Sequence, residues 1–296
     1  MMSEPKLPPL LLRNGRVHRN LCSLNSILQF LRHIPEFLAE LANWENASPL
    51  LNELRQVLST TGKNQVASAL ELRKSLAQAT GLPLNSGAQY DTVELFSYLL
   101  EHCPSQLFNF GTTHQYRFQI NNRASPCPSC NQFPPPIAGS DTILRLSLPT
   151  SASAIPLENL LKRHFAIHSQ SDGRCCTNCL SSQPNSPKLP YMEKLNIAKY
   201  PEYMIVQILR MEFRGGKTLK NPTAVDFSRP DNILIDKCNY SIVGLISHMG
   251  TPDAGHNRAY LRQGSNWFLC EDSKLPVCQM PSDTPSEQSY CILLRR

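Results

Sequence analysis

Hydrophobic residues in the first third of the chain recur every three to four positions, the spacing of helices that pack on one side. The first stripe predicts a helix that ends near Pro35, and it comprises Leu21, Leu24, Ile27, Leu28 and Leu31. A second stripe after that break comprises Ile34, Phe37, Leu38 and Leu41. Good helix formers fill 66–77, and Asp91 followed by Glu94 predicts the cap of a helix that continues to about His102.

The pattern changes after Cys103, where β-branched and aromatic residues gather in short runs bounded by Pro, Ser, Asn and Gly. These runs predict strands over 116–120, 142–148, 203–213, 240–247, 258–262, 266–270 and 289–294. The stretches 121–140 and 169–190 are predicted to be loops. Because helices precede the strands rather than alternate with them, the pattern indicates an α+β fold.

Length and composition narrow the classes of protein that fit this pattern. The chain has 296 residues, of which 41% are hydrophobic and 18% charged, so it can bury a sizeable core. No apolar run approaches the about 20 residues that span a bilayer. The N-terminal stretch MMSEPKLPPLLLRNGR has the features of neither a signal peptide nor an anchor. We therefore expect a cytoplasmic and/or nuclear protein that does not bind membranes.

Charge and cysteine content narrow the function further. The net charge of +6 comes from dispersed Lys and Arg residues with no basic block, which argues against nucleic-acid binding. The 11 cysteines are an odd number in a chain without a recognisable secretory signal. This favours reduced thiols, some of them with metal-binding or catalytic roles.

Four of the cysteines form two Cys-x-x-Cys pairs, Cys127 with Cys130 and Cys176 with Cys179. Such a turn places two thiolates on one side of a tight loop, and two turns complete a tetrahedral zinc site. Four thiolates leave no open position on the ion, so a zinc ion here is expected to be structural. Ordinary loop thiols are the alternative, since the gap between the pairs is longer than in a generic zinc ribbon.

Cys22 is the candidate nucleophile because it lies at the start of the first predicted helix, with Asn20 as the expected cap. A thiol in the first turn is close to the positive end of the helix dipole and to unpaired backbone N–H groups. Both lower the thiol pKa, and the same N–H groups can stabilise an oxyanion. Taken alone, a cysteine in this position is more often an inert packed thiol.

Several motifs in fixed order strengthen the prediction that Cys22 is catalytic. The matching segments are 20–29 (NLCSLNSILQ), 89–96 (QYDTVELF), the two Cys-x-x-Cys pairs, 208–211 (ILRM), 240–273 and 290–295 (YCILLR). Together they resemble the motifs of the ubiquitin-specific proteases, a family of cysteine deubiquitinases. The resemblance runs from about Asn14 to Arg295, so the chain is similar to a minimal catalytic core of that family.

The resemblance implies a papain-like fold with a helical thumb, a β-rich palm and zinc-bearing β fingers. It places a single catalytic domain over 14–296, after an N-terminal extension over 1–13. The thumb is expected over about 14–110, the fingers over about 115–200 with an embedded palm strand, and the palm over about 200–296. In that family, ubiquitin is gripped by the fingers while its C-terminal Gly-Gly tail enters a cleft between thumb and palm.

Carried over by position, the resemblance assigns Cys22 as the nucleophile and His256 as the general base. Glu271 matches the position of the residue that orients the imidazole, and Asp272 follows it directly. Asp272 is the favoured orienting residue, because its side chain has the length that the family normally uses. Glu271 is the alternative.

Other positions depart from the family pattern. Val17 stands where the family normally has an Asn that donates to the oxyanion, so we expect weakened activity. Asn20, His18 and backbone N–H groups are the candidate replacements for that donor. Ser23 and Asn257 replace two aromatic residues near the cleft, where a change could alter affinity or choice of modifier.

Gln89 and Asp91 are expected to contact the extended tail of the modifier. A plain helix cap is a compatible second role for Asp91.

The sequence thus predicts a thiol-dependent isopeptidase that acts on ubiquitin or a ubiquitin-like modifier and on their conjugates. A catalytically impaired relative that binds ubiquitin as a scaffold is the first alternative, and Val17, Glu271 and Asn257 motivate it. A nucleic-acid-binding protein is the second, but no interleaving of aromatic and basic residues supports it.

Overall fold

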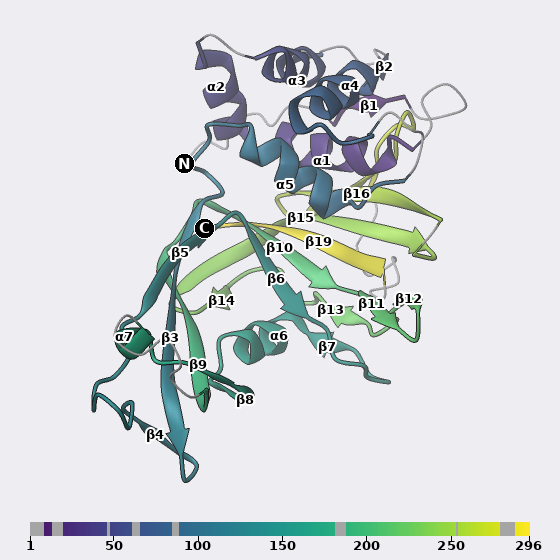
Figure 1. Ribbon diagram of the computed structural model, residues 1–296. Coiled ribbons are helices and arrows are strands. Elements are labelled where there is room, and N and C mark those ends of the chain that lie inside the picture. Colours follow the sequence, from purple (N-terminus) through teal and green to yellow (C-terminus); the bar gives the residue numbers. More distant parts are fainter. Residues whose placement is uncertain are drawn as a thin grey trace.

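The computed structural model describes residues 9–13, 20–45, 48–60, 66–84, 89–180, 188–252, 254–278 and 288–296. Five helices gather at one end of the molecule and form the thumb (Figure 1). They are α1 (Cys22–Arg32), α2 (Pro35–Asn43), α3 (Pro49–Ser59), α4 (Leu70–Thr80) and α5 (Thr92–Glu101). The sequence pattern predicts all of these except α3.

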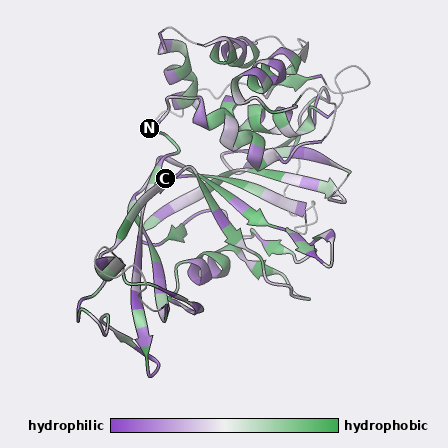
Figure 2. Cartoon of the chain, in the orientation of Figure 1, coloured by the Kyte–Doolittle hydropathy of each residue, from purple (hydrophilic) through white to green (hydrophobic). Residues whose placement is uncertain are grey.

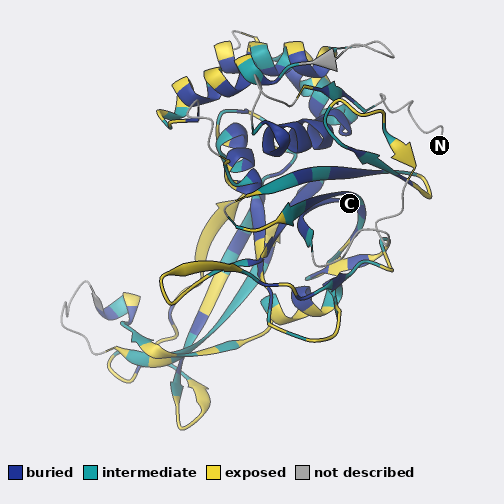
Figure 3. Cartoon of the chain, turned by 90° about the vertical axis from the view of Figure 1, so that its right-hand side faces the viewer, coloured by how far each residue is buried: buried dark blue, intermediate teal, exposed yellow. Residues whose placement is uncertain are grey.

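The first helix lies at the centre of the thumb, and each of its residues is buried, polar ones included (Figure 3). The polar side chains hold neighbouring backbone. Gln29 accepts from the Leu10 N–H at 3.0 Å and donates to the Leu10 carbonyl at 2.7 Å. Next to Leu10, β1 (Leu11–Leu12) pairs in parallel with β2 (Val66–Ala67). The described N-terminal residues are therefore part of the thumb core.

The palm is an eight-stranded sheet in the part of the chain that the structure describes. Its strands are β6 (Ile143–Ser147), β10 (Tyr203–Leu209), β14 (Ile233–Ile235), β15 (Cys238–Gly250), β16 (Gly255–Gln263), β17 (Asn266–Cys270), β18 (Val277–Cys278) and β19 (Ser289–Arg295). The order is β18-β17-β16-β15-β19-β10-β6, with β14 paired to β15. All neighbours are antiparallel except β6 and β10.

Both faces of the palm sheet are buried, which explains the nearly continuous hydrophobic runs of its central strands. Along β10, Ile205 packs into the core shared with the thumb helices, whereas Val206 packs into the core on the opposite face. Leu293 and Leu294 alternate in the same way along β19. The sheet is thus fixed between two apolar layers, and the ends of its strands can position a site rigidly.

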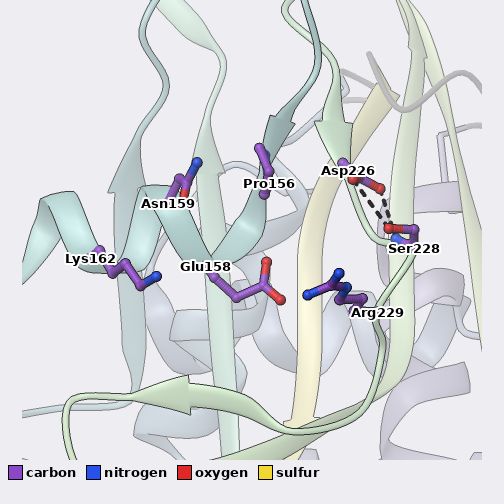
Figure 4. Close-up of a pocket in the computed structure, with 7 residues that line it drawn as sticks. All are labelled: Pro156, Glu158, Asn159, Lys162, Asp226, Ser228 and Arg229. Atoms are coloured by element: carbon purple, nitrogen blue, oxygen red, sulfur yellow. Dashed lines mark hydrogen bonds between the residues drawn. The ribbon is translucent and has the colours of Figure 1, made fainter.

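The core on the face of the palm sheet opposite the thumb is closed by α6 (Leu157–His164), with β7 (Ile155–Pro156) and β13 (Val225–Asp226) beside it. A cavity of about 390 Å³ opens here, on the side of the palm away from the thumb (Figure 4). Figure 4 shows the Glu158 carboxylate and the Arg229 guanidinium pointing toward one another across it. Its lining contains neither a thiol nor an imidazole, so it does not offer a cysteine-hydrolase centre.

The fingers form a separate five-stranded sheet among the described residues. Its strands are β3 (Phe110–Ile120), β4 (Arg123–Ser125), β5 (Ile137–Asp141), β8 (His168–Arg174) and β9 (Leu189–Lys199). A short helix, α7 (Thr177–Leu180), follows β8. Hydrophilic residues are frequent along these strands (Figure 2). The fingers core is small, and cysteines make up much of it.

The structure corrects several sequence expectations. The stretches 121–140 and 169–190 are not simply loops, since they contain β4, β5, β8 and the start of β9. Long exposed strands carry many polar residues, so the hydrophobic alternation that marks a half-buried strand is weak there. The predicted helix over 66–77 begins only at Leu70, after β2.

The predicted strand over 203–213 is interrupted at Arg210, and β11 (Met211–Arg214) then forms a hairpin with β12 (Lys217–Lys220). The Arg210 side chain is fully buried. Its guanidinium donates to the carbonyls of Asn221 and Thr223, at 3.1 and 2.6 Å. The break therefore turns a charged side chain inward to tie the hairpin to the palm.

No helix among the described residues is long and apolar enough to cross a membrane.

Candidate active site

Cys22 begins α1 and is 4% exposed, at the junction of thumb and palm. The expectation that Asn20 caps this helix is wrong: the N-cap is Leu21, whose side chain makes no capping hydrogen bond. Asn20 precedes it with a left-handed backbone, φ 59°. The left-handed residue turns the incoming chain into the helix, whose N-cap residue supplies no side-chain hydrogen bond to the first backbone N–H groups of α1.

His256 lies at the start of β16, and its side chain interacts with the Cys22 thiol. Burial raises the pKa of Cys22, but the His256 side chain and the Asn257 backbone N–H outweigh it and hold that pKa below its ordinary value. The bond to Cys22 raises the pKa of His256 above its ordinary value, against the effect of burial. The pair therefore favours thiolate and imidazolium, the reactive form of a cysteine hydrolase.

Two carboxylates lie close to the Nε2 atom of the His256 imidazole. Glu271 Oε1 lies 3.2 Å from Nε2, whereas Asp272 Oδ2 lies 3.8 Å away. The nearer group is thus Glu271 and not Asp272, the residue favoured from side-chain length. The extra methylene of Glu271 lets it reach the ring from the adjacent backbone position.

Each of the two carboxylates also contacts polar or charged residues other than His256. Arg258 and Lys274 lie 3.3 and 3.1 Å from Glu271. Burial raises the pKa of Glu271, but these cations and His256 lower it below its ordinary value. Asp272 Oδ1 accepts from Asn25 Nδ2 at 2.7 Å, so a polar residue of α1 fixes the position of Asp272. Neither Asn25 nor Arg258 was predicted from the sequence; the polar Asn25 three residues after Cys22, within the same motif, was the available signal.

Gln89 binds the backbone immediately before His256. Its Nε2 atom donates to the Gly255 carbonyl at 2.8 Å, and its Oε1 atom accepts from the Gly255 N–H at 2.9 Å. A Cβ at Gly255 would overlap the His248 imidazole, which explains the glycine at this position. Gln89 therefore links the thumb to the strand that carries His256.

Asp91 caps α5, as the sequence predicts, with Oδ1 accepting from the N–H groups of Val93 and Glu94 at 2.9 Å. Its other oxygen accepts from the Tyr290 hydroxyl of β19. Like Gln89, Asp91 connects the thumb to the palm near the cleft. Val17, by contrast, lies outside the described residues.

The two Cys-x-x-Cys pairs come together in the fingers, after β4 and after β8. Sγ atoms of Cys127 and Cys179 lie 3.8 Å apart, as do those of Cys130 and Cys176. The four sulfurs all lie within 4.8 Å of one another. A tetrahedral ion with Zn–S bonds of about 2.3 Å separates its sulfurs by about 3.8 Å. The cluster therefore fits a tetrahedral metal ion.

Fold and site together define a cysteine hydrolase: a buried thiol at a helix start faces an imidazole that carboxylates orient from the other side. The sequence profile of the ubiquitin carboxyl-terminal hydrolase family matches residues 15–294, and the chain belongs to that family.

The names of similar proteins agree with this family assignment. The chain is 25% identical to Ubiquitin carboxyl-terminal hydrolase 11 of Schizosaccharomyces pombe over 295 residues, covering 94% of this chain and 82% of that protein. It is 28% identical to Ubl carboxyl-terminal hydrolase 18 of Mus musculus, over 44% of this chain and 40% of that protein. Among solved structures, a chain of the SAGA Ubp8/Sgf11/Sus1/Sgf73 DUB module bound to ubiquitin aldehyde has a similar fold. The TM-score is 0.74 and the identity 18%, over 100% of this chain and 71% of that chain.

Proposed function

We propose that this protein is a thiol-dependent isopeptidase that hydrolyses the bond after the C-terminal glycine of ubiquitin or a ubiquitin-like modifier. The observation that carries the proposal is the interacting pair of Cys22 and His256 at the thumb–palm junction, in a chain of this family. The perturbed pKa values of both groups support a catalytic role over a structural one.

In the proposed reaction the Cys22 thiolate attacks the carbonyl carbon of the terminal glycine. The tetrahedral intermediate expels the lysine amine as the His256 imidazolium protonates it, leaving a thioester on Cys22. His256, now neutral, takes a proton from water, and the resulting hydroxide attacks the thioester. The released products are the modifier's free carboxylate and the regenerated thiolate.

The carboxylates and the oxyanion donors have supporting roles. Glu271 orients the imidazole and stabilises its charge, and Asp272, which Asn25 holds, lies behind it. Backbone N–H groups at the start of α1 and the Asn20 side chain are the proposed donors to the oxyanion. Gln89 and Asp91 are proposed to contact the incoming tail, in addition to the links that they make within the protein.

We further propose one catalytic domain over 14–296, against whose thumb the preceding residues 10–12 pack, with the four-cysteine cluster holding a structural zinc ion. All four ligands would be thiolates, so the ion would fix the fingers and take no part in the chemistry. The strands that precede the two cysteine pairs, β4 and β8, contain no buried residue, and the small core of the fingers alone offers little to hold them together. A cytoplasmic or nuclear location is consistent with reduced thiols at this cluster and at Cys22.

A panel of ubiquitin and ubiquitin-like probes with a C-terminal vinyl sulfone or propargyl group tests the proposal. Covalent labelling is expected with at least one probe and is expected to be lost in Cys22→Ser. Cys278→Ser, which changes an exposed thiol outside the site, is the matched control and should label normally. Modifier binding without labelling or turnover, unchanged by Cys22→Ala, would instead identify a scaffold.

A further inference from the structure

A tight turn joins β15 to β16 directly before His256. β15 ends at Gly250 and β16 begins at Gly255, and these two glycines pair across the sheet. Within the turn, the Thr251 N–H donates to the Ala254 carbonyl at 2.9 Å, and the Ala254 N–H donates to Thr251 Oγ1 at 3.2 Å. Gly250 has a positive φ of 99°, and a Cβ on it would overlap the Ala254 carbonyl. The turn is therefore compact, and its position sets that of His256.

The Lys220 side chain binds the end of β15 that enters this turn. Its ammonium donates to the carbonyl of His248 at 2.5 Å and to that of Gly250 at 3.2 Å. In the described part of the chain, β19 pairs with β15 only as far as Ser247. Carbonyls beyond the end of such a ladder need donors from elsewhere. Lys220 supplies them from the hairpin of β11 and β12, which Figure 1 shows on the same side of the palm as the turn.

The backbone of Lys220 is itself anchored. Lys220 pairs with Met211 across the hairpin, and the next residue, Asn221, is buried. The Asn221 N–H donates to the Arg210 carbonyl at 2.7 Å, and the Asn221 side-chain amide donates to the Leu148 carbonyl at 2.8 Å. The base of the hairpin is therefore fixed to the palm, and the Lys220 side chain extends from a rigid support.

The Lys220 ammonium is partly removed from water. Burial, and after it the nearby Arg210 guanidinium, lowers the pKa of Lys220 below its ordinary value. A charged donor in such a place makes stronger hydrogen bonds to carbonyls than one in water. Gln89 holds Gly255, at the other end of the same turn. The turn is thus held at both ends, by one side chain from the thumb and by one from the hairpin.

We propose that Lys220 is a positioning residue for His256: it fixes the end of β15 and, through the turn, the backbone from which the imidazole extends toward Cys22. Its effect on turnover rests on the proposed function, whereas its effect on the Cys22 thiol needs no substrate. Without Lys220 the carbonyls of His248 and Gly250 lose a charged donor, so the turn can shift. A misplacement of about 1 Å in a reacting group can cost about a hundredfold in rate.

The first measurement compares wild type, Lys220→Met and Lys217→Met by steady-state cleavage of a modifier with a C-terminal fluorogenic amide. Methionine keeps most of the apolar stem without the charge, and Lys217, exposed at the start of β12, is the matched control position. Lys220→Met is expected to lose about tenfold in kcat with little change in KM, and Lys217→Met to lose nothing. Lys220→Arg, which keeps a cation that can donate to both carbonyls, should recover most of the loss. An unchanged kcat in Lys220→Met, or a loss in KM alone, would overturn the inference.

The second measurement follows alkylation of Cys22 by iodoacetamide across a pH series, without substrate. A displaced imidazole lowers the thiol pKa less, so alkylation of Lys220→Met should begin at higher pH than that of wild type. In a His256→Gln background, Lys220→Met should add no further shift, because Lys220 acts through the imidazole. A further shift of the same size in that background, or no shift in the single variant, would contradict the assigned role.

Melting temperatures show whether each variant is folded. If Lys220→Met is unfolded, Lys220→Gln, whose amide keeps one donor group for the carbonyls, takes its place with the same expectations. If wild type cleaves no modifier substrate, the isopeptidase proposal fails, while the alkylation comparison still decides the role of Lys220. Normal turnover together with an unchanged alkylation profile in Lys220→Met overturns the inference and leaves the isopeptidase proposal standing.

Discussion

Gln89 holds Gly255 by two hydrogen bonds, one to the N–H and one to the carbonyl of the residue that directly precedes His256. A side-chain amide that pairs with both groups of one residue replaces a missing strand neighbour. The contact joins the thumb to the palm beside the cleft that we propose receives the modifier tail. It sets the position of the backbone from which the imidazole extends toward Cys22.

Replacing Gln89 by alanine is therefore expected to lower kcat/KM by about tenfold, because His256 loses part of its backbone support and the tail loses a contact. Steady-state cleavage of a fluorogenic modifier conjugate measures this. Gln56→Ala, at an exposed glutamine of α3 outside the cleft, is the control and should be unchanged. A melting temperature far below that of wild type would show that Gln89 acts on folding instead.

Replacing each of the two carboxylates in turn by its amide separates the roles of Glu271 and Asp272. Glu271→Gln keeps the shape of the side chain but removes the nearer charge from the imidazolium, so kcat/KM is expected to fall by about a hundredfold. Asp272→Asn should cost less, because that carboxylate is farther from Nε2 and is held by Asn25. A larger loss for Asp272→Asn than for Glu271→Gln would assign the orienting role to Asp272.

The pH dependence of thiol reactivity follows from the directions of the two pKa shifts. The pKa of Cys22 is lowered and that of His256 is raised, which favours the thiolate–imidazolium pair. We therefore expect a bell-shaped pH–rate profile whose two apparent pKa values belong to the coupled pair. Turnover should rise as pH passes the lowered thiol pKa and fall as pH passes the raised imidazole pKa, where the leaving amine loses its proton donor.

In His256→Gln the main cause that lowers the thiol pKa is gone while burial, which raises it, remains. Alkylation of Cys22 by iodoacetamide should then begin only at higher pH than in wild type. Quantifying the modified Cys22 peptide by mass spectrometry across a pH series measures the shift. An unchanged profile would mean that the imidazole does not set the state of the thiol.

The four-cysteine cluster predicts one zinc ion per chain by elemental analysis of the purified protein. Cys176→Ser should lose most of that zinc and melt at a lower temperature, since it removes one of four ligands. Cys103→Ser changes a buried thiol of the thumb core and should retain the metal. Full zinc content in Cys176→Ser would contradict the assignment.

At Val17, unlike at the positions above, a substitution is predicted to raise the activity. Val17→Asn restores the side-chain donor that the family normally carries, so kcat is expected to rise by about tenfold or more, with little change in KM. Asn20→Ala in the wild-type background should lower kcat if Asn20 supplies the missing donor. Unchanged rates in both variants would indicate that backbone N–H groups suffice.

Much of the fold follows from local pattern. The helical stripes locate α1 and α2, Asp91 marks the cap of α5, and hydrophobic runs locate the central palm strands. The finger strands β4, β5 and β8 were harder, because they have no buried residues whose alternation would reveal them. The two Cys-x-x-Cys pairs were visible in the sequence because their spacing is itself the signal.

The sequence alone determined which residue types are available for chemistry: one thiol at a helix start, one histidine after a glycine, two adjacent carboxylates and four paired cysteines. Only the tertiary structure decided how these groups are arranged relative to one another. Glu271 is nearer the imidazole than Asp272, Gln89 holds Gly255, and Lys220 holds Gly250. These partners are far apart along the chain, and distance and direction between such groups are set by packing, which local pattern does not encode.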